Sequence, residues 1–363
     1  MTPAVFAVAK EYQIMLPVEF EATMWVKAGD KNYYDHSNGV LRSNNYVHKD
    51  SVPMEVLDEH ESYTVCLRKI VKRKPYFTET EEIEETTYRF YPVRGERVRA
   101  YHISDAHNSI EEPIKAAKAY GDIDFLILNG DIPDHCGNEK NVITIYKIIS
   151  KLTHGTIPVV FSRGNHDMRG KYAEKFAEYT PCYHGCSYYT FRLGHIWGMV
   201  LDCGEDKLDT HEEYGHTVCC HAFREQETEF IRQVIGRAEE EYESDGVTHK
   251  LIVVHNPFTR QREDGIFKIE DETYRLWTGL IREHIKPAVI LSGHWHSFGI
   301  YHCGGKEDSY GQPCPVVVGT DRRKLKEDKL YFGGAGLQFE KNSIKVSFTS
   351  NQNENEERMC IDL

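Results

Sequence analysis

Hydrophobic and polar residues alternate in short runs over the first part of the chain. The clearest runs cover 22–27, 62–70 and 86–93. Alternation with a period of two is typical of half-buried antiparallel strands. A basic run at 69–74 and an acidic run at 79–85 indicate either a charged hairpin or two solvated faces. We therefore predict a small, all-β, sandwich-like accessory domain over residues 1–95.

From residue 96 onward, continuous apolar runs replace the alternating pattern. Five runs have the character of buried strands, at 98–104, 123–129, 157–162, 250–255 and 288–292. Helical periodicity occupies 110–120, 141–152, 223–243 and 270–285. Strands that alternate with helices predict the α/β fold class, and hairpin patterns at 188–202 and 331–349 predict sheets of mixed direction. We assign residues 96–350 to this second domain and expect the polar tail, 351–363, to fray.

The charge balance narrows the classes of function. The 363 residues include 44 basic and 57 acidic side chains, which gives a formal net charge of −13 and argues against nucleic acid as a partner. No run of 18 apolar residues is present, and the apolar start at 4–9 lacks the basic residues of a signal peptide. We expect a cytoplasmic protein that does not bind membranes and whose ten cysteines are reduced. The oligomeric state does not follow from these features.

Potential ligand side chains follow all five predicted buried strands. They are Asp105 and His107, Asp131, Asn165, His255, and finally His294 and His296. Ligands of α/β folds bind beyond the carboxyl ends of the strands. Residues two apart in extended backbone point the same way, so Asp105 and His107 can hold one ion together. Mixed Asp, Asn and His ligands favour Mn, Fe or Zn over Ca, and seven candidates suit two ions that share a carboxylate.

The ordered blocks D-x-H, G-D-x-x-D, G-N-H-D, H and G-H-x-H resemble those of the calcineurin-like metallophosphoesterase family, over roughly residues 97–298. The resemblance implies a four-layer α/β/β/α sandwich with a dinuclear metal centre. It implies that Asp105, His107 and His296 hold one ion and that Asn165, His255 and His294 hold the other. Asp131 would bridge both ions.

The same resemblance implies a hydrolase that acts on a small phosphorylated substrate. It implies that two bound metal ions would supply an activated water for attack on phosphorus, that His166 would assist the leaving group and that Asp167 would orient its imidazole. Arg163 either contacts the phosphate or pairs with Asp167 or Asp134, and His135 either touches substrate or is an ordinary loop residue. A phosphomonoesterase is slightly favoured. The alternatives are a phosphodiesterase, for a cyclic nucleotide or another small diester, and a non-catalytic metal-binding interaction module.

The β domain ahead of the second domain is similar in layout to purple acid phosphatases, which implies an immunoglobulin- or fibronectin-like fold. That group has a tyrosine ligand after the G-D block and a D-x-G first block, whereas this chain has Asp134 and Asp105-Ala106-His107. The tyrosine–iron colour of that group is therefore not expected. The histidine- and cysteine-containing segment 203–224 forms either a lid over the site or a second metal site.

Overall fold

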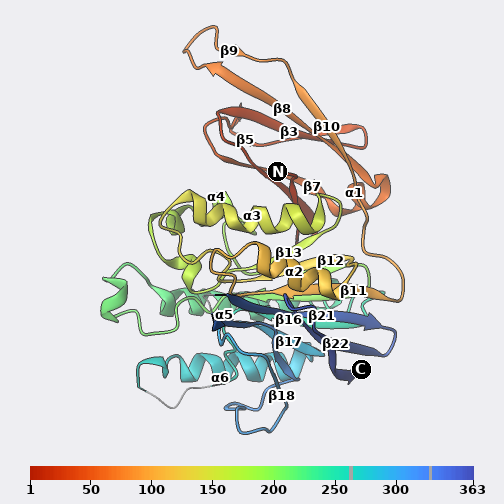
Figure 1. Cartoon of the computed structure of the whole chain (residues 1–363), viewed down its shortest axis with the longest axis vertical. Helices are drawn as coiled ribbons and strands as arrows, with labels where there is room; N and C mark the ends of the chain where they lie inside the picture. Colours follow the sequence, from red (N-terminus) through yellow and green to blue (C-terminus); the bar gives the residue numbers. More distant parts are fainter. Residues whose placement is uncertain (261–264, 327–328) are drawn as a thin grey trace.

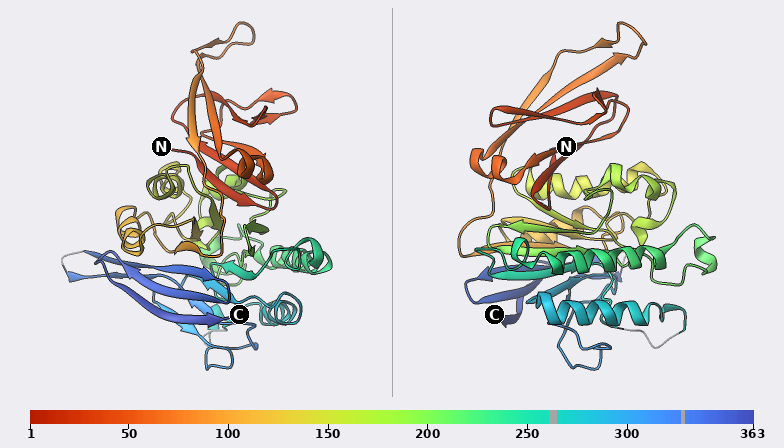
Figure 2. Two further views of the ribbon diagram at one scale, coloured as in Figure 1. Left: turned by 90° about the vertical axis from the view of Figure 1, so that its right-hand side faces the viewer. Right: turned by 180° about the vertical axis from the view of Figure 1, so that it is seen from behind.

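The computed structural model describes residues 1–260, 265–326 and 329–363. Two β-sheets lie face to face at its centre, and helices cover the outer face of each sheet (Figure 1). A further sheet of N-terminal strands extends from the side of the body that carries α3 (Glu139–Thr153), and the other views show the same arrangement (Figure 2). These layers confirm the predicted α/β sandwich with a strand-rich N-terminal region.

The first central sheet has ten strands and a parallel middle. Its middle strands are β11 (Val98–Ile103), β12 (Phe125–Asn129) and β13 (Val159–Ser162). On one side follow β21 (Leu330–Glu340), β22 (Ser343–Ser350) and β23 (Asn355–Asp362), with β20 (Asp321–Lys324) paired to β21. On the other side lie β1 (Ala4–Val8), β2 (Glu11–Pro17) and β7 (Val47–Pro53). Every residue of β12 is buried, as expected of a strand covered on both faces.

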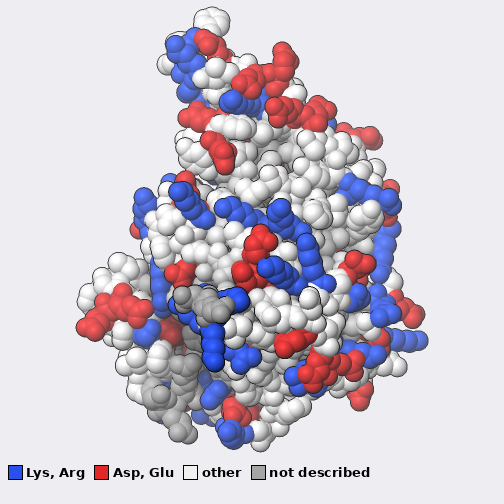
Figure 3. All heavy atoms as spheres, in the orientation of Figure 1, with Lys and Arg blue, Asp and Glu red and all other residues white. Residues whose placement is uncertain are grey.

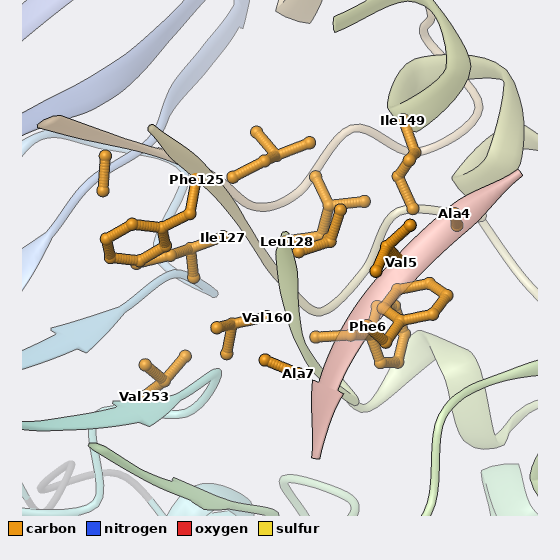
Figure 4. Close-up of a cluster of buried hydrophobic side chains, with 14 of the residues drawn as sticks. Ala4, Val5, Phe6, Ala7, Phe125, Ile127, Leu128, Ile149, Val160 and Val253 are labelled. Atoms are coloured by element: carbon orange, nitrogen blue, oxygen red, sulfur yellow. The ribbon is translucent and has the colours of Figure 1, made fainter. Parts of the chain in front are cut away.

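The second central sheet has six strands. They are β14 (Tyr189–Leu193), β15 (Ile196–Leu201), β16 (His249–Val254), β17 (Val289–Ser292), β19 (Val316–Val318) and β18 (Gly299–Tyr301). Helices α2 (Glu111–Tyr120) and α3 cover the first sheet, and α5 (Cys220–Gly236) and α6 (Asp271–Leu280) cover the second. Side chains of both sheets share one apolar core, in which Val253 of β16 faces Val160 of β13 (Figure 4).

The N-terminal strands divide among three sheets, the smallest of which pairs β5 (His36–Ser37) with β6 (Val40–Leu41). The separate sheet contains β3 (Ala22–Ala28), β4 (Lys31–Tyr34), β8 (Ser62–Lys72) and β10 (Glu84–Arg89), with β9 (Glu79–Thr80) paired to β8 and α1 (Met54–His60) at its base. In contrast, β1 runs parallel to β13 within the first central sheet, with Phe6 opposite Val159. The side chains of Val5 and Phe6 pack beside Ile149 of α3 (Figure 4). Because β1 is apolar on both faces, burial in the middle of that sheet removes more apolar surface from water than a sheet edge would.

The C-terminal tail differs from the prediction. We expected residues 351–363 to fray, but residues 355–362 form β23, which pairs with β22 over its whole length. Most of its side chains are exposed, and its backbone hydrogen bonds hold it in place. A polar sequence is therefore compatible with an edge strand, where only the backbone must be satisfied.

The charged runs at 69–74 and 79–85 face each other across the projecting hairpin. Lys69 Nζ lies 3.1 Å from a Glu81 carboxylate oxygen, and Lys74 pairs with Glu79. Basic and acidic side chains are intermixed there and over the rest of this face of the molecule (Figure 3). The hairpin interpretation of these runs is thus confirmed. Within the described residues, no helix combines the length and the apolar character needed to cross a bilayer.

Candidate metal centre

Seven side chains from five strand ends meet between the two central sheets. Asp105 and His107 follow β11, Asp131 follows β12 and Asn165 follows β13 in the first sheet. His255 follows β16, and His294 and His296 follow β17 in the second sheet. Both sheets present the carboxyl ends of their parallel strands to the same side of the sandwich, so residues far apart in sequence come together.

One group of candidate ligand atoms comes from Asp105, His107 and His296, whose ligand atoms all lie within 4.8 Å of one another. The Nε2 atoms of His107 and His296 are 3.0 Å apart, and His296 Nε2 lies 3.2 Å from Asp105 Oδ1. A second group comes from Asp131, His255 and His294. Asp131 Oδ2 lies 3.2 Å from His255 Nε2 and 3.9 Å from His107 Nε2, so this carboxylate faces both groups. Asn165 Oδ1 lies 3.1 Å from His294 Nδ1.

The protonation of these groups fits metal binding. Burial lowers the pKa of His107 and of His294 to about 4, so both imidazoles are neutral at pH 7 and keep a lone pair. His255 Nδ1 lies 2.7 Å from the backbone carbonyl of Asn129, to which it donates, and this contact turns Nε2 toward the carboxylates. His255 Nε2 is buried and makes no hydrogen bond.

The negative charge around His255 also favours a bound cation. Burial alone would lower the pKa of His255, but the carboxylates of Asp131 and Asp105 raise it to about 10. Without an ion, a proton on His255 therefore neutralises part of the negative charge of the two aspartates. His255 Nε2 makes no hydrogen bond and lies 3.2 Å from the Asp131 carboxylate and 3.7 Å from that of Asp105, an arrangement that a bound cation satisfies.

The backbone at the site is strained at most of the candidate ligands. Asp105, His107, Asp131, His294 and His296 all have φ between 42° and 70°, a region that side chains other than glycine rarely adopt. Neighbouring glycines allow the ligand loops to pack closely, because they carry no side chain. A Cβ on Gly164 would lie 2.3 Å from Asp131 Oδ1. The surrounding sheets therefore hold these side chains in place against a local conformational cost.

His166 lies beside the two groups, but Asp167 does not orient it as we predicted. His166 Nδ1 donates to the backbone carbonyl of Asp134 (2.7 Å), and Nε2 accepts a long hydrogen bond from Arg169 (3.3 Å). Asp167 Oδ2 instead accepts the backbone N–H groups of Asp131 (3.0 Å) and Gly164 (2.7 Å). Asp167 thus links two ligand loops, because its buried carboxylate accepts from their backbone N–H groups and not from the imidazole of His166.

Two predicted substrate contacts lie elsewhere. The Arg163 side chain donates to Asp202 (Nε–Oδ2 2.5 Å) and lies against the rings of Phe176 and Phe223, so it pairs with neither Asp167 nor Asp134 and does not line the pocket. His135 is exposed, and its Nδ1 accepts the backbone N–H of Gly137 (2.9 Å) in its own turn. For both residues, the backbone of the turn after the strand directs the side chain away from the pocket. The residue types do not indicate that direction.

Two cations that the sequence reasoning missed line the pocket beside the centre. The pocket has a volume of about 240 Å³, and its walls are Asp131, Asn165, His166, His294, His296, Arg169, Asp206, Lys207 and Phe267. Arg169 follows His166 by one short helical turn, a spacing that could have indicated it. Lys207 lies 3.1 Å from Asp206 and 3.0 Å from Glu213.

The loop that follows β15 supplies one wall of this pocket. Asp206 Oδ2 lies 3.6 Å from His294 Nε2. In the same loop, the carboxylate of Glu205 accepts two hydrogen bonds from Arg169, at 2.9 and 3.0 Å. Among the residues that the structure describes, segment 203–224 contributes no cluster of metal-ligating side chains, and His221 pairs with Glu270 instead. From this segment, Asp206 and Lys207 line the pocket. That it forms a lid stays a prediction.

Comparisons with known proteins agree with this fold. A purple acid phosphatase from seeds of yellow lupin (Lupinus luteus) superposes with a TM-score of 0.57 at 12% identity, over 99% of this chain and 73% of that one. A dimetal phosphatase from Danio rerio superposes with a TM-score of 0.50 at 12% identity, over 75% of this chain and 99% of that one. At such identities the likeness shows the fold alone. A search among curated proteins found no match.

The sequence itself carries the assignment. The sequence profile of the calcineurin-like phosphoesterases matches residues 98–298, which is more than half of the chain and spans all five ligand blocks. Members of this family use dinuclear metal centres. This chain therefore belongs to the calcineurin-like phosphoesterase family and is a hydrolase of phosphoric esters.

Proposed function

We propose that this chain is a dinuclear metal-dependent phosphomonoesterase. The observation that carries the proposal is the presence of two neighbouring ligand groups, Asp105 with His107 and His296, and Asp131 with His255 and His294. Asp131 also groups with His107 and His166, Asn165 Oδ1 lies 3.1 Å from His294 Nδ1, and the buried Nε2 of His255 makes no hydrogen bond. Asp105, His107 and His296 would hold one ion, and Asn165, His255 and His294 the other. Two ions of Mn, Fe or Zn, when bound, supply an activated water and neutralise charge on the phosphoryl oxygens.

His166 is proposed to hold the proton that the leaving oxygen receives. Its Nδ1–H is occupied by the Asp134 carbonyl, so the proton would be held at Nε2, in place of the long hydrogen bond that this atom accepts from Arg169. Arg169 is proposed to bind a phosphoryl oxygen through its guanidinium, and Lys207 to bind a second oxygen through its ammonium. In this arrangement Asp167 is a positioning residue, since it touches backbone groups of the ligand loops only.

The choice between monoester and diester depends on the charge of the pocket. Two cations, Arg169 and Lys207, suit the dianion of a monoester. The diester alternative is favoured by one observation, because the carboxylates of Glu205, Asp206 and Glu213 already pair with both cations. We retain the monoester as the proposal, with a small phosphorylated compound as the substrate.

We also propose residues 96–350, together with the edge strand β23, as the catalytic domain and residues 1–95 as an accessory domain that buttresses it. Support for the buttress comes from β1, β2 and β7, which extend the catalytic sheet beyond β13. Deletion of 1–95 would therefore remove three strands of that sheet. A cytoplasmic location is proposed because all ten cysteines are free thiols, as a reducing compartment would keep them.

The test combines elemental analysis with activity on one metal-loaded sample. The full-length chain is stripped with EDTA and reloaded with Mn, Fe or Zn, and hydrolysis of p-nitrophenyl phosphate is compared with that of bis-p-nitrophenyl phosphate. Two metal equivalents with a higher kcat/KM for the monoester are expected. Fewer than two equivalents under every loading would overturn the site, and a higher kcat/KM for the diester would replace the monoester proposal.

Two variants locate the activity. His255→Ala is expected to bind one equivalent fewer and to lose most activity, because it removes a proposed ligand of the second ion. The matched control is His284→Ala, an exposed imidazole in the turn after α6, which should retain both metals and full activity.

A further inference from the structure

Two cations of the catalytic pocket share one carboxylate. Glu213 Oε1 lies 3.3 Å from Arg169 Nη1, and Glu213 Oε2 lies 3.0 Å from Lys207 Nζ. Each oxygen of this carboxylate therefore pairs with a different cation. Arg169 and Lys207 both line the catalytic pocket, beside the candidate metal ligands. The Glu213 carboxylate thus pairs with both cations as two oxygens of a phosphoryl group would.

Two other acidic side chains that pair with these cations are held more firmly. Glu205 is completely buried and accepts two hydrogen bonds from Arg169. The Asp206 side chain is 14% exposed and lies 3.6 Å from His294 Nε2. In contrast, the Glu213 side chain is 40% exposed. A buried carboxylate that loses its cation leaves an uncompensated charge, whereas an exposed one moves into water. Glu213 is therefore the carboxylate that can leave at the lowest cost.

A short turn presents Glu213 to the cations. Glu213 belongs to the 3-10 helix η3 (Glu212–Tyr214), and its backbone N–H donates to Nδ1 of His211 at 3.3 Å. The next residue, Tyr214, is buried, and its hydroxyl donates to Glu205 at 3.0 Å. The turn is thus anchored through Tyr214. Rotation of the Glu213 side chain alone can release the cations, without unfolding of the turn.

The charge state of Glu213 fits competition with an anion. The hydrogen bond from Lys207 lowers the pKa of Glu213, and the charge of Arg169 lowers it further, so the carboxylate is ionised at pH 7. A second anion that binds the same two cations would be repelled by this charge. Direct contact of a phosphoryl group with both cations therefore requires that the carboxylate leaves them.

We propose that the Glu213 carboxylate is an internal competitor for the phosphate site, which occupies Arg169 and Lys207 until the phosphoryl group of the substrate displaces it. The proposal rests on the proposed function, since it assumes that these two cations bind phosphate. Competition of this kind weakens the binding of substrate and of phosphate by the same factor. It raises KM and leaves kcat unchanged, because Glu213 has left the cations in the saturated enzyme.

The test compares Glu213→Gln with the unmodified, full-length protein, both loaded with Mn and freed of excess metal. Calorimetry measures the Kd of inorganic phosphate, and hydrolysis of p-nitrophenyl phosphate measures KM and kcat. Partly exposed ion pairs shift equilibria by up to about 5-fold each, so loss of both should lower Kd and KM by about 3- to 10-fold at constant kcat. General damage to the site would weaken phosphate binding instead. An unchanged or higher Kd would therefore overturn the proposal.

Two further variants complete the design. Glu212→Gln is the matched control, because Glu212 is exposed on the same turn and, among the described ion pairs, contacts neither cation; Kd and KM should stay unchanged. In a Lys207→Met background, Glu213→Gln should tighten phosphate binding by a smaller factor, since one of its two contacts is already absent. An equal factor in both backgrounds would contradict competition at Lys207.

Failure of this inference can be distinguished from failure of the proposed function. If no ester is hydrolysed, the proposed function fails, and the binding of inorganic phosphate decides the competition by itself. Tighter binding by Glu213→Gln would support the internal competitor. Equal binding by the two proteins, or binding by neither, would refute it.

Discussion

The ion pair between Arg169 and Glu205 ties the loop after β15 to the residue beside His166. Glu205 is completely buried, and both of its carboxylate oxygens accept from Arg169, at 2.9 and 3.0 Å. The Tyr214 hydroxyl donates to the same carboxylate at 3.0 Å. The Arg169 side chain is 26% exposed and lines the catalytic pocket. One guanidinium therefore serves both the stability of the loop and the proposed binding of phosphate.

Replacing Arg169 by Met would leave the Glu205 carboxylate buried without its cation. Removing one partner of a buried ion pair typically destabilises a protein by about 3–5 kcal/mol. Because Tyr214 still donates and Arg169 is partly exposed, we expect a smaller loss than in that range, about 2–3 kcal/mol, for Arg169→Met. Arg169→Met combined with Glu205→Gln should recover the free energy of unfolding to within about 1 kcal/mol of the unmodified protein, since no charge is then buried alone.

Equilibrium unfolding in urea, followed by far-ultraviolet circular dichroism, measures both variants on the same scale. Arg232→Met is the matched control, because Arg232 pairs with Glu229 on the surface, where side chains are 49% and 60% exposed, and its loss should cost less than about 0.5 kcal/mol. Activity should fall in the single and in the double variant, since both lack the guanidinium. The reasoning would be refuted if Arg169→Met unfolded within 1 kcal/mol of the unmodified protein, or if the double variant were no more stable than the single one.

Three further predictions concern the centre and the accessory domain. Gly164→Ala should displace Asp131, since the added Cβ would lie 2.3 Å from Asp131 Oδ1. We expect kcat/KM to fall by about 100-fold with loss of bound metal, and retention of two metal equivalents would contradict this. Burial, and then Asp35, raises the pKa of Asp50 to about 9, so the folded state holds a proton that the unfolded state releases near pH 4. The free energy of unfolding should thus fall as the pH rises from 4 to 9. Asp50→Asn should stabilise the protein by about 2–4 kcal/mol at pH 8 but not at pH 4. Urea unfolding measures this difference, and an effect that does not depend on pH would count against the prediction. EDTA should lower the Tm and abolish activity, and excess Mn should restore both. Ions that bind only the folded state stabilise it by about 3 kcal/mol when their free concentration is 100 times Kd. An unchanged Tm would contradict metal binding.

Much of the site could be predicted from local sequence because the ligand blocks follow buried strands directly. The runs before Asp105, Asp131 and His255 are apolar enough to identify central strands, and the chain must turn where they end. In an α/β sandwich those turns share one edge, so the convergence of the ligands followed from the order of strands and helices. The predicted strand limits at 98–104, 123–129 and 250–255 agree with β11, β12 and β16 to within two residues.

Other features depend on contacts between distant segments. The pairing of β1 with β13 joins residues about 150 positions apart, and no local pattern distinguishes that partner from another strand. The same holds for β23, whose polar sequence resembles a free tail until its backbone finds β22. Strand pairing is a backbone interaction, so the identity of the side chains constrains it only through burial.

The sequence by itself determined the α/β class, the five ligand blocks and the family, because each depends on residue types within a few positions of one another. Only the tertiary structure decided that Arg169 and not Arg163 lines the pocket, and that the Asp134 carbonyl and not Asp167 holds His166. Side-chain direction in a loop follows from backbone dihedral angles, and those angles are set by the packing of two sheets against each other. The residue types indicate the chemistry of the centre, and the fold determines which of these residues face it.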